Sequence, residues 1–467
     1  MDRAVRKRRR VNASDIFRRM KCAAAIAMLS LLLLTQTALA DTRQSLDALA
    51  QDFGGSFDTL LTSEQIVPGD AVSDWIALVA GRCGGDGSDY LQRLETYVSE
   101  CYARQGGLDR VKPTEWHRIS LTVLALGGDP TSFGTDADGH PVDLIADGTY
   151  NWHTTDSPGI QGLNAWIYAL LTLDAKAYAV PEDALYPRHA IVQAILGAQE
   201  PDGSFGLNRG HGNVDITAMA LQALAPYANG TLRYAVPNGT EITVDDAIAL
   251  ALDWLHTQQL PDGSFANSCS TAQVVLALCD LGIPPSDFSR DGHSAAEGLL
   301  SFLTPDGLFR YLPADEDHDI MATEQGILAL SAMERLDKGQ RRIFDYRAEM
   351  EDSLQQEIRS LNEELSLLTE ETPTQQIEAL YGRYKALPSA ERSYVTAYPH
   401  LKAALERTGL SLIDDDPAAA YNLTPPTRMQ AAEQTSLHPW IFVVVGVAAA
   451  IAIGAVVLRK KGAKHHV

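Results

Sequence analysis

Pro201-Asp202-Gly203-Ser204-Phe205 is written three times in this chain. Residues 261–265 repeat all five letters, and residues 305–309 repeat four of them. Pro-Asp-Gly is turn chemistry, because proline fixes φ, aspartate bonds to local backbone and glycine accepts a positive φ. The copies stand between pairs of amphipathic or apolar runs, which are 189–199 and 215–224, 245–259 and 270–281, and 293–303 and 319–333. The sequence therefore predicts a repeated unit of helix, tight turn, short loop and helix, about 50 residues long.

Weaker copies of the same unit lie upstream, at residues 51–57, 105–108 and 148–150. Together the copies predict six helix pairs between residues 42 and 340. One pair cannot bury its apolar face alone, and an open stack would need polar capping pairs at both ends. The chain shows no such caps. We therefore expect an all-α fold in which residues 41–345 form an α6/α6 toroid, a closed ring of six helix pairs.

The two ends of the chain predict targeting and anchoring segments. Residues 1–40 combine a basic start, an apolar core and the small-residue site Ala38-Leu39-Ala40, as a signal peptide does. Residues 440–458 are an unbroken apolar run, about 28 Å long as a helix, which predicts one transmembrane helix. The basic tail, 459–467, places the C-terminus in the cytoplasm by the positive-inside rule. We expect a single-pass protein of the cell membrane with an extracellular N-terminal ectodomain.

Between the ring and the anchor, the composition predicts a stalk and a linker. Residues 346–410 are charged and heptad-like, and we expect three helices there, at 349–368, 375–387 and 390–407. Residues 411–439 are polar and rich in proline and alanine, which indicates a flexible linker.

Charge and cysteine content limit the classes of partner. The formal net charge is −22, and without the basic leader and tail the ectodomain carries about −33. Such a surface repels nucleic acid, which is bound through basic footprints, so we expect no nucleic-acid partner. Four cysteines follow the leader, and neighbouring ones lie at opposite ends of a predicted helix or hairpin, too far apart for a disulfide. These cysteines are Cys83, Cys101, Cys269 and Cys279.

The repeated turns carry a family resemblance. Their Gln-x-x-x-Gly-Ser-Phe pattern resembles the prenyltransferase and squalene-cyclase repeat family, whose fold is a double ring of six inner and six outer helices. Five further stretches are more similar to bacterial surface proteins that resemble the ring domain of transcobalamin and intrinsic factor. These stretches are 113–118, 161–165, 215–224, 270–274 and 321–325. The resemblance implies a ring that binds a corrinoid or similar small molecule and requires no cofactor. In transcobalamin-like proteins a β-rich domain closes over the ligand, whereas helices and a linker stand in its place here.

The motifs of the related enzymes are incomplete. Squalene-type cyclases protonate an alkene with Asp-x-Asp-Asp, which does not occur in this sequence. Zinc-dependent prenyltransferases use Asp-x-Cys and a distant histidine, where this chain has Asn267-Ser268-Cys269 and Ala322. We therefore predict no catalytic residue and no metal site. Cys269 remains a candidate reactive thiol, because a helix N-terminus lowers a thiol pKa. The alternative is a packed thiol.

We expect any ligand to bind where the inner helices begin. Six helix N-termini pointing one way gather partial positive charge and unpaired N–H groups. The loops that lead into them are where the chain places its aromatic and polar residues. The candidate ligand-binding residues are Trp116, Trp152, Trp166, His211, Asn213, Asp215, Asn267, Cys269, His318 and Asp319. The alternative for each is that the tryptophans belong to the core and the polar groups cap helices.

The sequence thus favours a membrane-anchored extracellular protein that binds a small-molecule ligand without turning it over. One alternative is an enzyme of the terpene cyclase or prenyltransferase kind that uses an acid outside the known motifs. Another is a scaffold that docks a protein partner at the cell surface.

Overall fold

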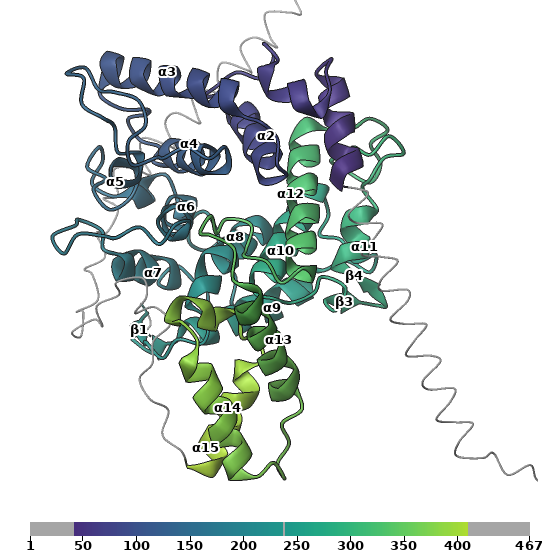
Figure 1. The fold of residues 1–467 in the computed structure, drawn as a ribbon. Helices are drawn as coiled ribbons and strands as arrows, with labels where there is room; N and C mark the ends of the chain where they lie inside the picture. Colours follow the sequence, from purple (N-terminus) through teal and green to yellow (C-terminus); the bar gives the residue numbers. More distant parts are fainter. Residues whose placement is uncertain (1–41, 237–238, 410–467) are drawn as a thin grey trace, which may run out of the picture.

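The computed structural model describes residues 42–236 and 239–409, and this part of the chain is almost entirely helical (Figure 1). Residues 42–52 form the first helix, and later helices alternate between two roles. The helices that lead into a turn, with the first helix, are called outer helices: α3 (Ser88–Gln105), α5 (Leu144–Gly148), α7 (Arg188–Leu196), α9 (Val244–Gln258) and α11 (Ala295–Leu300). The helices that follow a turn are called inner helices: α2 (Ala71–Arg82), α4 (Thr114–Ala125), α6 (Leu163–Asp174), α8 (Val214–Leu224), α10 (Ser268–Asp280) and α12 (Ile320–Asp337).

The remaining elements of this region are short. Three 3-10 helices and four two-residue strands stand in the loops: η1 (Phe57–Thr62), η2 (Pro158–Ile160), η3 (Ala225–Tyr227), β1 (Tyr234–Ala235), β2 (Glu241–Ile242), β3 (Ser289–Arg290) and β4 (His293–Ser294). The strands pair only as β1 with β2 and β3 with β4, both antiparallel. The predicted all-α class is confirmed.

The three Pro-Asp-Gly turns adopt one structure. Gly203, Gly263 and Gly307 have φ of 92°, 85° and 97°, in the left-handed region that favours glycine. In each copy, the amide of the phenylalanine donates a hydrogen bond to a buried threonine hydroxyl of the following inner helix. The pairs and their N···O distances are Phe205–Thr217 at 2.9 Å, Phe265–Thr271 at 3.0 Å and Phe309–Thr323 at 3.0 Å.

Two of these glycines also let the turn touch the next outer helix. A Cβ on Gly203 would lie 2.3 Å from the carbonyl oxygen of Leu250 in α9. A Cβ on Gly263 would lie 2.1 Å from that of Ser294, which caps α11. The third copy packs against the first helix, because a Cβ on Gly307 would lie 3.1 Å from the side chain of Gln44. Each turn therefore rests on another helix pair.

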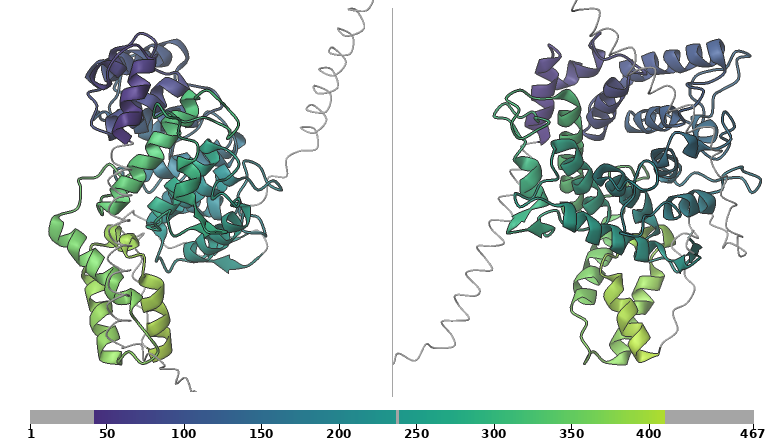
Figure 2. Two further views of the ribbon diagram at one scale, coloured as in Figure 1. Left: turned by 90° about the vertical axis from the view of Figure 1, so that its right-hand side faces the viewer. Right: turned by 180° about the vertical axis from the view of Figure 1, so that it is seen from behind.

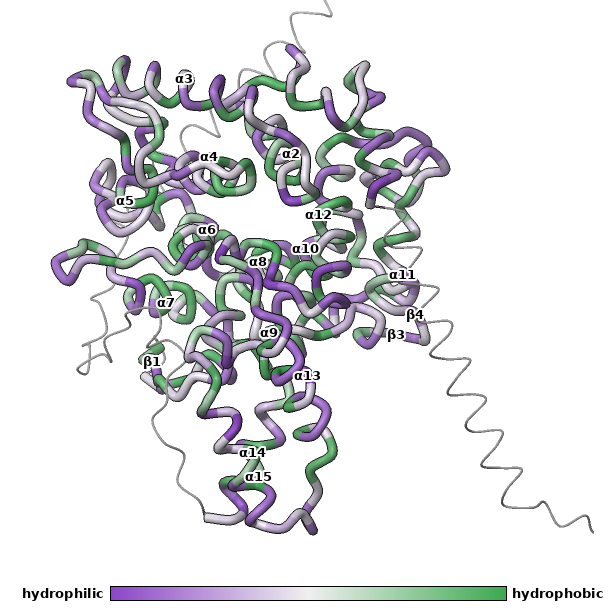
Figure 3. Tube along the Cα trace, viewed as in Figure 1, coloured by the Kyte–Doolittle hydropathy of each residue, from purple (hydrophilic) through white to green (hydrophobic). Residues whose placement is uncertain are grey.

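The inner helices pack side by side. Each one contacts the next along the chain, and α12 also contacts α2. The two ends of the region lie together: the first helix (purple) is beside α12 and its preceding loop in Figures 1 and 2. His318 in that loop contacts the carboxylate of Asp52 at 3.0 Å. Hydrophobic residues recur along the inner helices (green in Figure 3), which supply much of a core running from Leu46 to Phe344.

The C-terminal helices have a core of their own, running from Met350 to Leu405. They are α13 (Asp352–Ser366), α14 (Thr374–Ala386), η4 (Ser389–Tyr394) and α15 (Tyr398–Thr408). They extend away from the helix pairs in all views of Figures 1 and 2. The predicted third stalk helix, 390–407, is wrong as one element: it divides into η4 and α15. Pro399, in the first turn of α15, has no N–H and could not continue an α-helix from upstream.

Residues 340–346, called the crossing segment, run across the C-terminal ends of several inner helices. Arg342 donates hydrogen bonds to the carbonyls of Asp280, at the end of α10, and of Ala225, just after α8. Its own carbonyl accepts from Arg82 at the end of α2, and the amide of Tyr346 donates to the carbonyl of Ala175 just after α6. This segment therefore binds one end of the inner-helix set.

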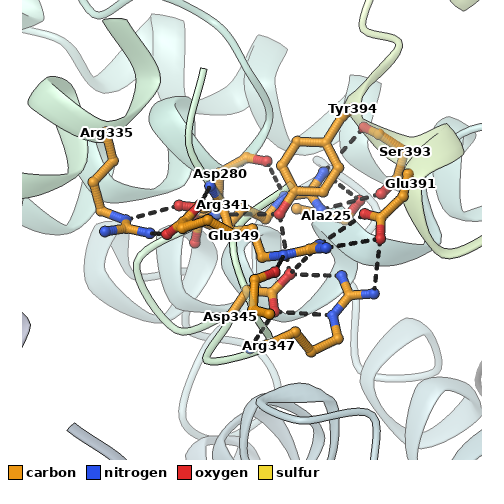
Figure 4. A network of polar contacts seen from close by, with 12 residues as sticks. Ala225, Asp280, Arg335, Arg341, Asp345, Arg347, Glu349, Glu391, Ser393 and Tyr394 are labelled. Atoms are coloured by element: carbon orange, nitrogen blue, oxygen red, sulfur yellow. Dashed lines mark hydrogen bonds and ion pairs between the residues drawn. The ribbon is translucent and has the colours of Figure 1, made fainter. Parts of the chain in front are cut away.

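Ion pairs join the crossing segment to the C-terminal helices (Figure 4). Arg341 forms a two-bonded pair with Glu391 of η4, with N–O distances of 2.8 and 3.0 Å. Asp345 pairs with Arg341 and Arg347 at 3.4 and 2.6 Å. A cavity of about 280 Å³ lies beside this network, between the C-terminal halves of α10 and α12 and the face of α13.

Several predicted segments lie outside the described residues. These are the signal peptide at 1–40, the linker at 411–439, the transmembrane helix at 440–458 and the tail at 459–467. Within 42–236 and 239–409, no helix has the length and apolar character needed to cross a membrane.

Candidate functional site

The inner helices begin at one face of the helix-pair region, which we call the N-terminal face. Their C-terminal ends meet on the crossing segment, so their first turns lie at the opposite end. Backbone contacts link these starts: the amide of Leu163 donates to the carbonyl of Leu207, and that of Ser268 donates to Tyr311, both at 3.0 Å. The loop before one inner helix thus contacts the start of the preceding one.

Three of the predicted polar residues cap inner helices. Asn213, Asn267 and Asp319 each accept a hydrogen bond from the backbone amide three residues later, at 3.0, 2.8 and 2.8 Å. Such a bond satisfies one of the free N–H groups at a helix start. These three side chains therefore cap helices, which is the alternative role that the sequence offered for them.

The predicted tryptophans lie in the core. Trp116 and Trp152 are 3% and 1% exposed and pack edge to face, with ring centroids 5.4 Å apart. The indole N–H of Trp116 donates to the hydroxyl of Tyr102 at 2.7 Å. Trp166 is partly buried against Tyr186, with centroids 5.3 Å apart. Their packing leaves Trp116 and Trp152 almost no surface for a ligand.

The two predicted histidines lie in different loops and have different surroundings. His211 is exposed. His318 pairs with Asp52 of the first helix, and its side chain is 26% exposed. Two predicted residues, Asp215 and Asp319, lie close enough to Cys269 to affect the pKa of its thiol.

Cys269 does not have the environment of a reactive thiol. Burial, and then the carboxyls of Glu324, Asp319 and Asp215, raise the pKa of this thiol to about 12. The expectation of a pKa lowered by the helix N-terminus is therefore wrong, because burial and negative neighbours outweigh the helix dipole. All four cysteines of the described region are free thiols.

Three unpartnered oxygens lie at this face, of which sequence reasoning named Asp215 and missed Asn164 and Glu324. Asn164 Oδ1, Asp215 Oδ1 and Glu324 Oε2 are buried and have no hydrogen-bond partner. A signal for part of the set was available in the helix register. Glu115, Asn164, Asp215 and Cys269 are each the second residue of an inner helix, α4, α6, α8 and α10 in turn. A polar or acidic residue thus recurs at one position around the face.

Glu324 is the most deeply placed of these groups. It is 2% exposed, and burial raises its carboxyl pKa well above the ordinary value. Burial therefore favours the protonated form of this carboxyl. Burial and the nearby Glu324 also raise the pKa of Tyr168 in α6, which places the two side chains near each other.

Aromatic and amide side chains link the inner helices further along. Trp75 of α2 packs on Tyr168 and on Phe344 of the crossing segment, with centroid distances of 6.0 and 6.4 Å. Gln222, Gln273 and Gln325 form a ladder across α8, α10 and α12, with side-chain distances of 3.0 and 3.3 Å. Aromatic contacts and an amide ladder therefore join inner helices whose first turns carry acidic side chains.

Exposed apolar side chains surround this face, and we call them the apolar collar. The described region has twelve large exposed hydrophobic residues. Seven of them lie in loops that lead into inner helices: Val67, Val111, Ile160, Leu207, Leu260, Tyr311 and Leu312. Two more, Val72 and Met321, stand in first turns of inner helices. The loops at the opposite ends of the helices carry one, Leu185. The exposed apolar surface therefore gathers at the N-terminal face.

One group in the described region has the composition of a metal site. The ligand atoms of Asp136, Asp138 and His140 lie within 4.8 Å of one another. Asp136 Oδ1 already accepts the backbone amides of Asp138 and His140, at 2.9 and 2.8 Å, which is an ordinary loop arrangement. This loop is distant in sequence from the residues of the N-terminal face.

The arrangement at the N-terminal face has the features of a binding surface. It offers exposed apolar side chains, buried oxygens without a hydrogen-bond partner, and one buried carboxyl whose pKa is raised. Compared with known proteins, the sequence matches no family model and no curated relative.

Proposed function

We propose that residues 42–345 form a closed ring of six helix pairs that binds a ligand at the N-terminal face and releases it unchanged. The contact of α12 with α2 supports the closed ring. So does the third turn, whose Gly307 approaches Gln44 of the first helix. A ring removes the two exposed end faces that an open stack of repeats would have to cap.

The observation that carries the binding function is the apolar collar around buried, unpartnered oxygens. Nine of the twelve large exposed hydrophobic residues in the described region stand at this face, and a concentration of exposed apolar side chains marks a candidate interaction site. Buried polar atoms are normally hydrogen-bonded, so a group of unsatisfied acceptors suits a partner that brings donors. Apolar walls with a few placed polar groups are what ligand sites combine.

The first ligand to test is a corrinoid, which the resemblance of the repeats implies. A corrinoid ring has apolar faces and peripheral amides, whose N–H groups suit acceptor oxygens. The C-terminal helices contact the opposite ends of the inner helices through the crossing segment. They therefore leave the N-terminal face uncovered, and a ligand would bind there without a second domain closing over it.

The protein would be displayed at the cell surface through the predicted C-terminal membrane helix. In that arrangement the C-terminal helices lie between the membrane and the ring, and the N-terminal face points outward. Protease added to intact cells should then remove the helix pairs and leave a short membrane-bound fragment. Protection of the whole chain would contradict this placement.

The test of binding compares collar variants with matched controls. Ile160→Lys combined with Met321→Lys should weaken the binding of cyanocobalamin at least about tenfold in calorimetric titration. Leu185→Lys combined with Leu367→Lys adds the same charge at exposed leucines away from this face and should leave affinity unchanged. Equal affinity of both double variants would rule out the N-terminal face as the site. Mass spectrometry of molecules that co-purify with the protein identifies the ligand if it is not a corrinoid.

Glu324 favours a second candidate, an enzyme of the cyclase kind. A buried carboxyl whose pKa is raised, near the aromatic ring of Tyr168, is a chemically suitable proton donor for an alkene. The test is incubation with squalene and with geranylgeraniol, followed by product analysis. A cyclised product that disappears in Glu324→Gln would establish catalysis.

A further inference from the structure

The centre of the N-terminal face is built from acceptors. Asn164 and Asp215 occupy the same register position on the neighbouring helices α6 and α8, and each has a buried oxygen with no donor. Glu324 of α12 adds a third buried oxygen without a partner. The amide oxygen of Asn164 and the carboxylate of Asp215 can only accept hydrogen bonds, so these two can be satisfied only by N–H or O–H groups.

Two arginines on or near the starts of inner helices have other partners. Arg118 of α4 donates to the carboxylates of Asp74 and Glu115, at 2.9 and 2.7 Å, and to the carbonyl of Gly69. Arg310, in the loop before α12, donates to backbone carbonyls. The exposed loop before α4 adds Arg110 and Lys112 at the edge of the face. No described basic group is therefore bonded to the three oxygens at the centre.

Two aspartates bring negative charge to this centre. Asp319 and Asp215 both oppose ionisation of the Cys269 thiol, so both carboxyl groups lie near it. The partly exposed ring of Tyr168 lies near Glu324, with Trp75 behind it. A positively charged nitrogen suits all three features of this centre. It donates hydrogen bonds to the acceptor oxygens, is attracted by the negative carboxylates and can lie over an aromatic ring.

We infer that the ligand of the N-terminal face is an organic cation, in which a protonated amine contacts Asp215 and Asn164 while an apolar body lies on the collar. The inference rests on the proposed binding function and adds the charge of the ligand. An anionic ligand of the same shape would meet the carboxyls of Asp215 and Asp319 and would be repelled. The strongly acidic ectodomain adds long-range attraction for a cation.

The experiment uses three probes that share an aromatic body and differ in charge: phenethylammonium, phenethyl alcohol and phenylacetate. The full chain, purified in a non-ionic detergent, is titrated with each by calorimetry. Phenethylammonium should bind at least about tenfold tighter than phenylacetate, with the alcohol between them. Asp215→Asn should abolish most of this preference and leave the affinity for the alcohol nearly unchanged. Asp253→Asn, an exposed carboxylate on α9, removes the same charge elsewhere and should preserve the preference.

The outcomes separate this inference from the function on which it rests. If phenylacetate binds as tightly as phenethylammonium, and Ile160→Lys with Met321→Lys weakens both, the face binds ligands but is not selective for cations. Equal effects of Asp215→Asn and Asp253→Asn would likewise overturn the role of Asp215. If no probe binds, the cation inference fails, and the binding function is judged by the cyanocobalamin titration alone. If the collar variant leaves every affinity unchanged, including that for cyanocobalamin, the face is not a ligand site and both proposals fail.

Discussion

The guanidinium of Arg342 donates a 2.6 Å hydrogen bond to the carbonyl of Asp280, the last residue of α10. The same side chain reaches the carbonyl of Ala225 after α8 and both oxygens of Ser393 in η4. Helix C-termini carry partial negative charge and unpaired carbonyls, which a cation satisfies. One arginine thus joins two inner helices to the C-terminal helices and fixes the crossing segment between them.

Arg342→Ala should lower the free energy of unfolding by about 2 to 4 kcal/mol, because several buried carbonyls lose their donor at once. Urea denaturation followed by circular dichroism measures the change. Arg359→Ala is the matched control: Arg359 lines the cavity beside the crossing segment and is exposed. Its loss should cost less than about 0.5 kcal/mol. Equal effects of the two variants would show that the crossing segment does not depend on Arg342.

The pair between Arg341 and Glu391 should be costly to break. Both side chains are 7% exposed, and the two bonds are parallel. Glu391→Gln removes the negative charge that balances the buried guanidinium of Arg341. We expect the free energy of unfolding to fall by about 3 kcal/mol. Asp47→Asn breaks the exposed pair with Arg43 and should cost less than about 1 kcal/mol in the same denaturation experiment. A loss below about 1 kcal/mol for Glu391→Gln would mean that the junction is solvated.

The close approach of a turn glycine to its neighbouring helix can be tested by comparing two glycines that have the same backbone conformation. Gly263 and Gly210 have φ of 85° and 83°, but a Cβ on Gly210 would meet nothing within 4 Å. Gly210→Ala should therefore cost only the left-handed strain, about 1 to 2 kcal/mol. Gly263→Ala adds a clash with the backbone at Ser294 and should cost at least about 2 kcal/mol more, or prevent folding. Similar melting temperatures for the two variants would contradict the close approach of this turn to α11.

Much of the helical framework follows from the sequence, because its signals are local. The turn motif fixes where helices end and begin, and α8 and α10 start within two residues of the predicted runs. The capping role of Asn213, Asn267 and Asp319 was also open to sequence reasoning, since these residue types precede apolar runs. The break at Pro399 was predictable by the same kind of local rule and was missed.

The centre of the candidate site was less accessible to sequence reasoning, because it depends on which side of each inner helix turns inward. The hydrophobic pattern does not decide this for helices such as α10, all of whose residues are buried. Trp116 and Trp152 were predicted at the site because of their loops, yet they pack into the core. Glu324 was hidden in an apolar run, and only its three-dimensional neighbours mark it as unusual.

The buried carboxyl of Asp280 gives a pH-dependent stability whose sign can be worked out. Burial raises its pKa to about 7, against an ordinary value of 3.8. The folded chain therefore holds this proton over a pH range in which the unfolded chain has released it. Stability falls as pH rises from about 4 to about 7, by up to about 1.4 kcal/mol per unit, and then levels off.

Asp280→Asn removes this titration, so the stability of the variant relative to the wild type should rise across the same pH window and be constant above it. Urea denaturation of both proteins at several pH values measures the difference, in which other titrating groups cancel. Asp287→Asn, an exposed carboxylate shortly after α10, should give a difference that does not change with pH. A flat difference for Asp280→Asn as well would mean that this carboxyl ionises in the folded chain as it does in the unfolded one, with Arg342 compensating fully for its burial.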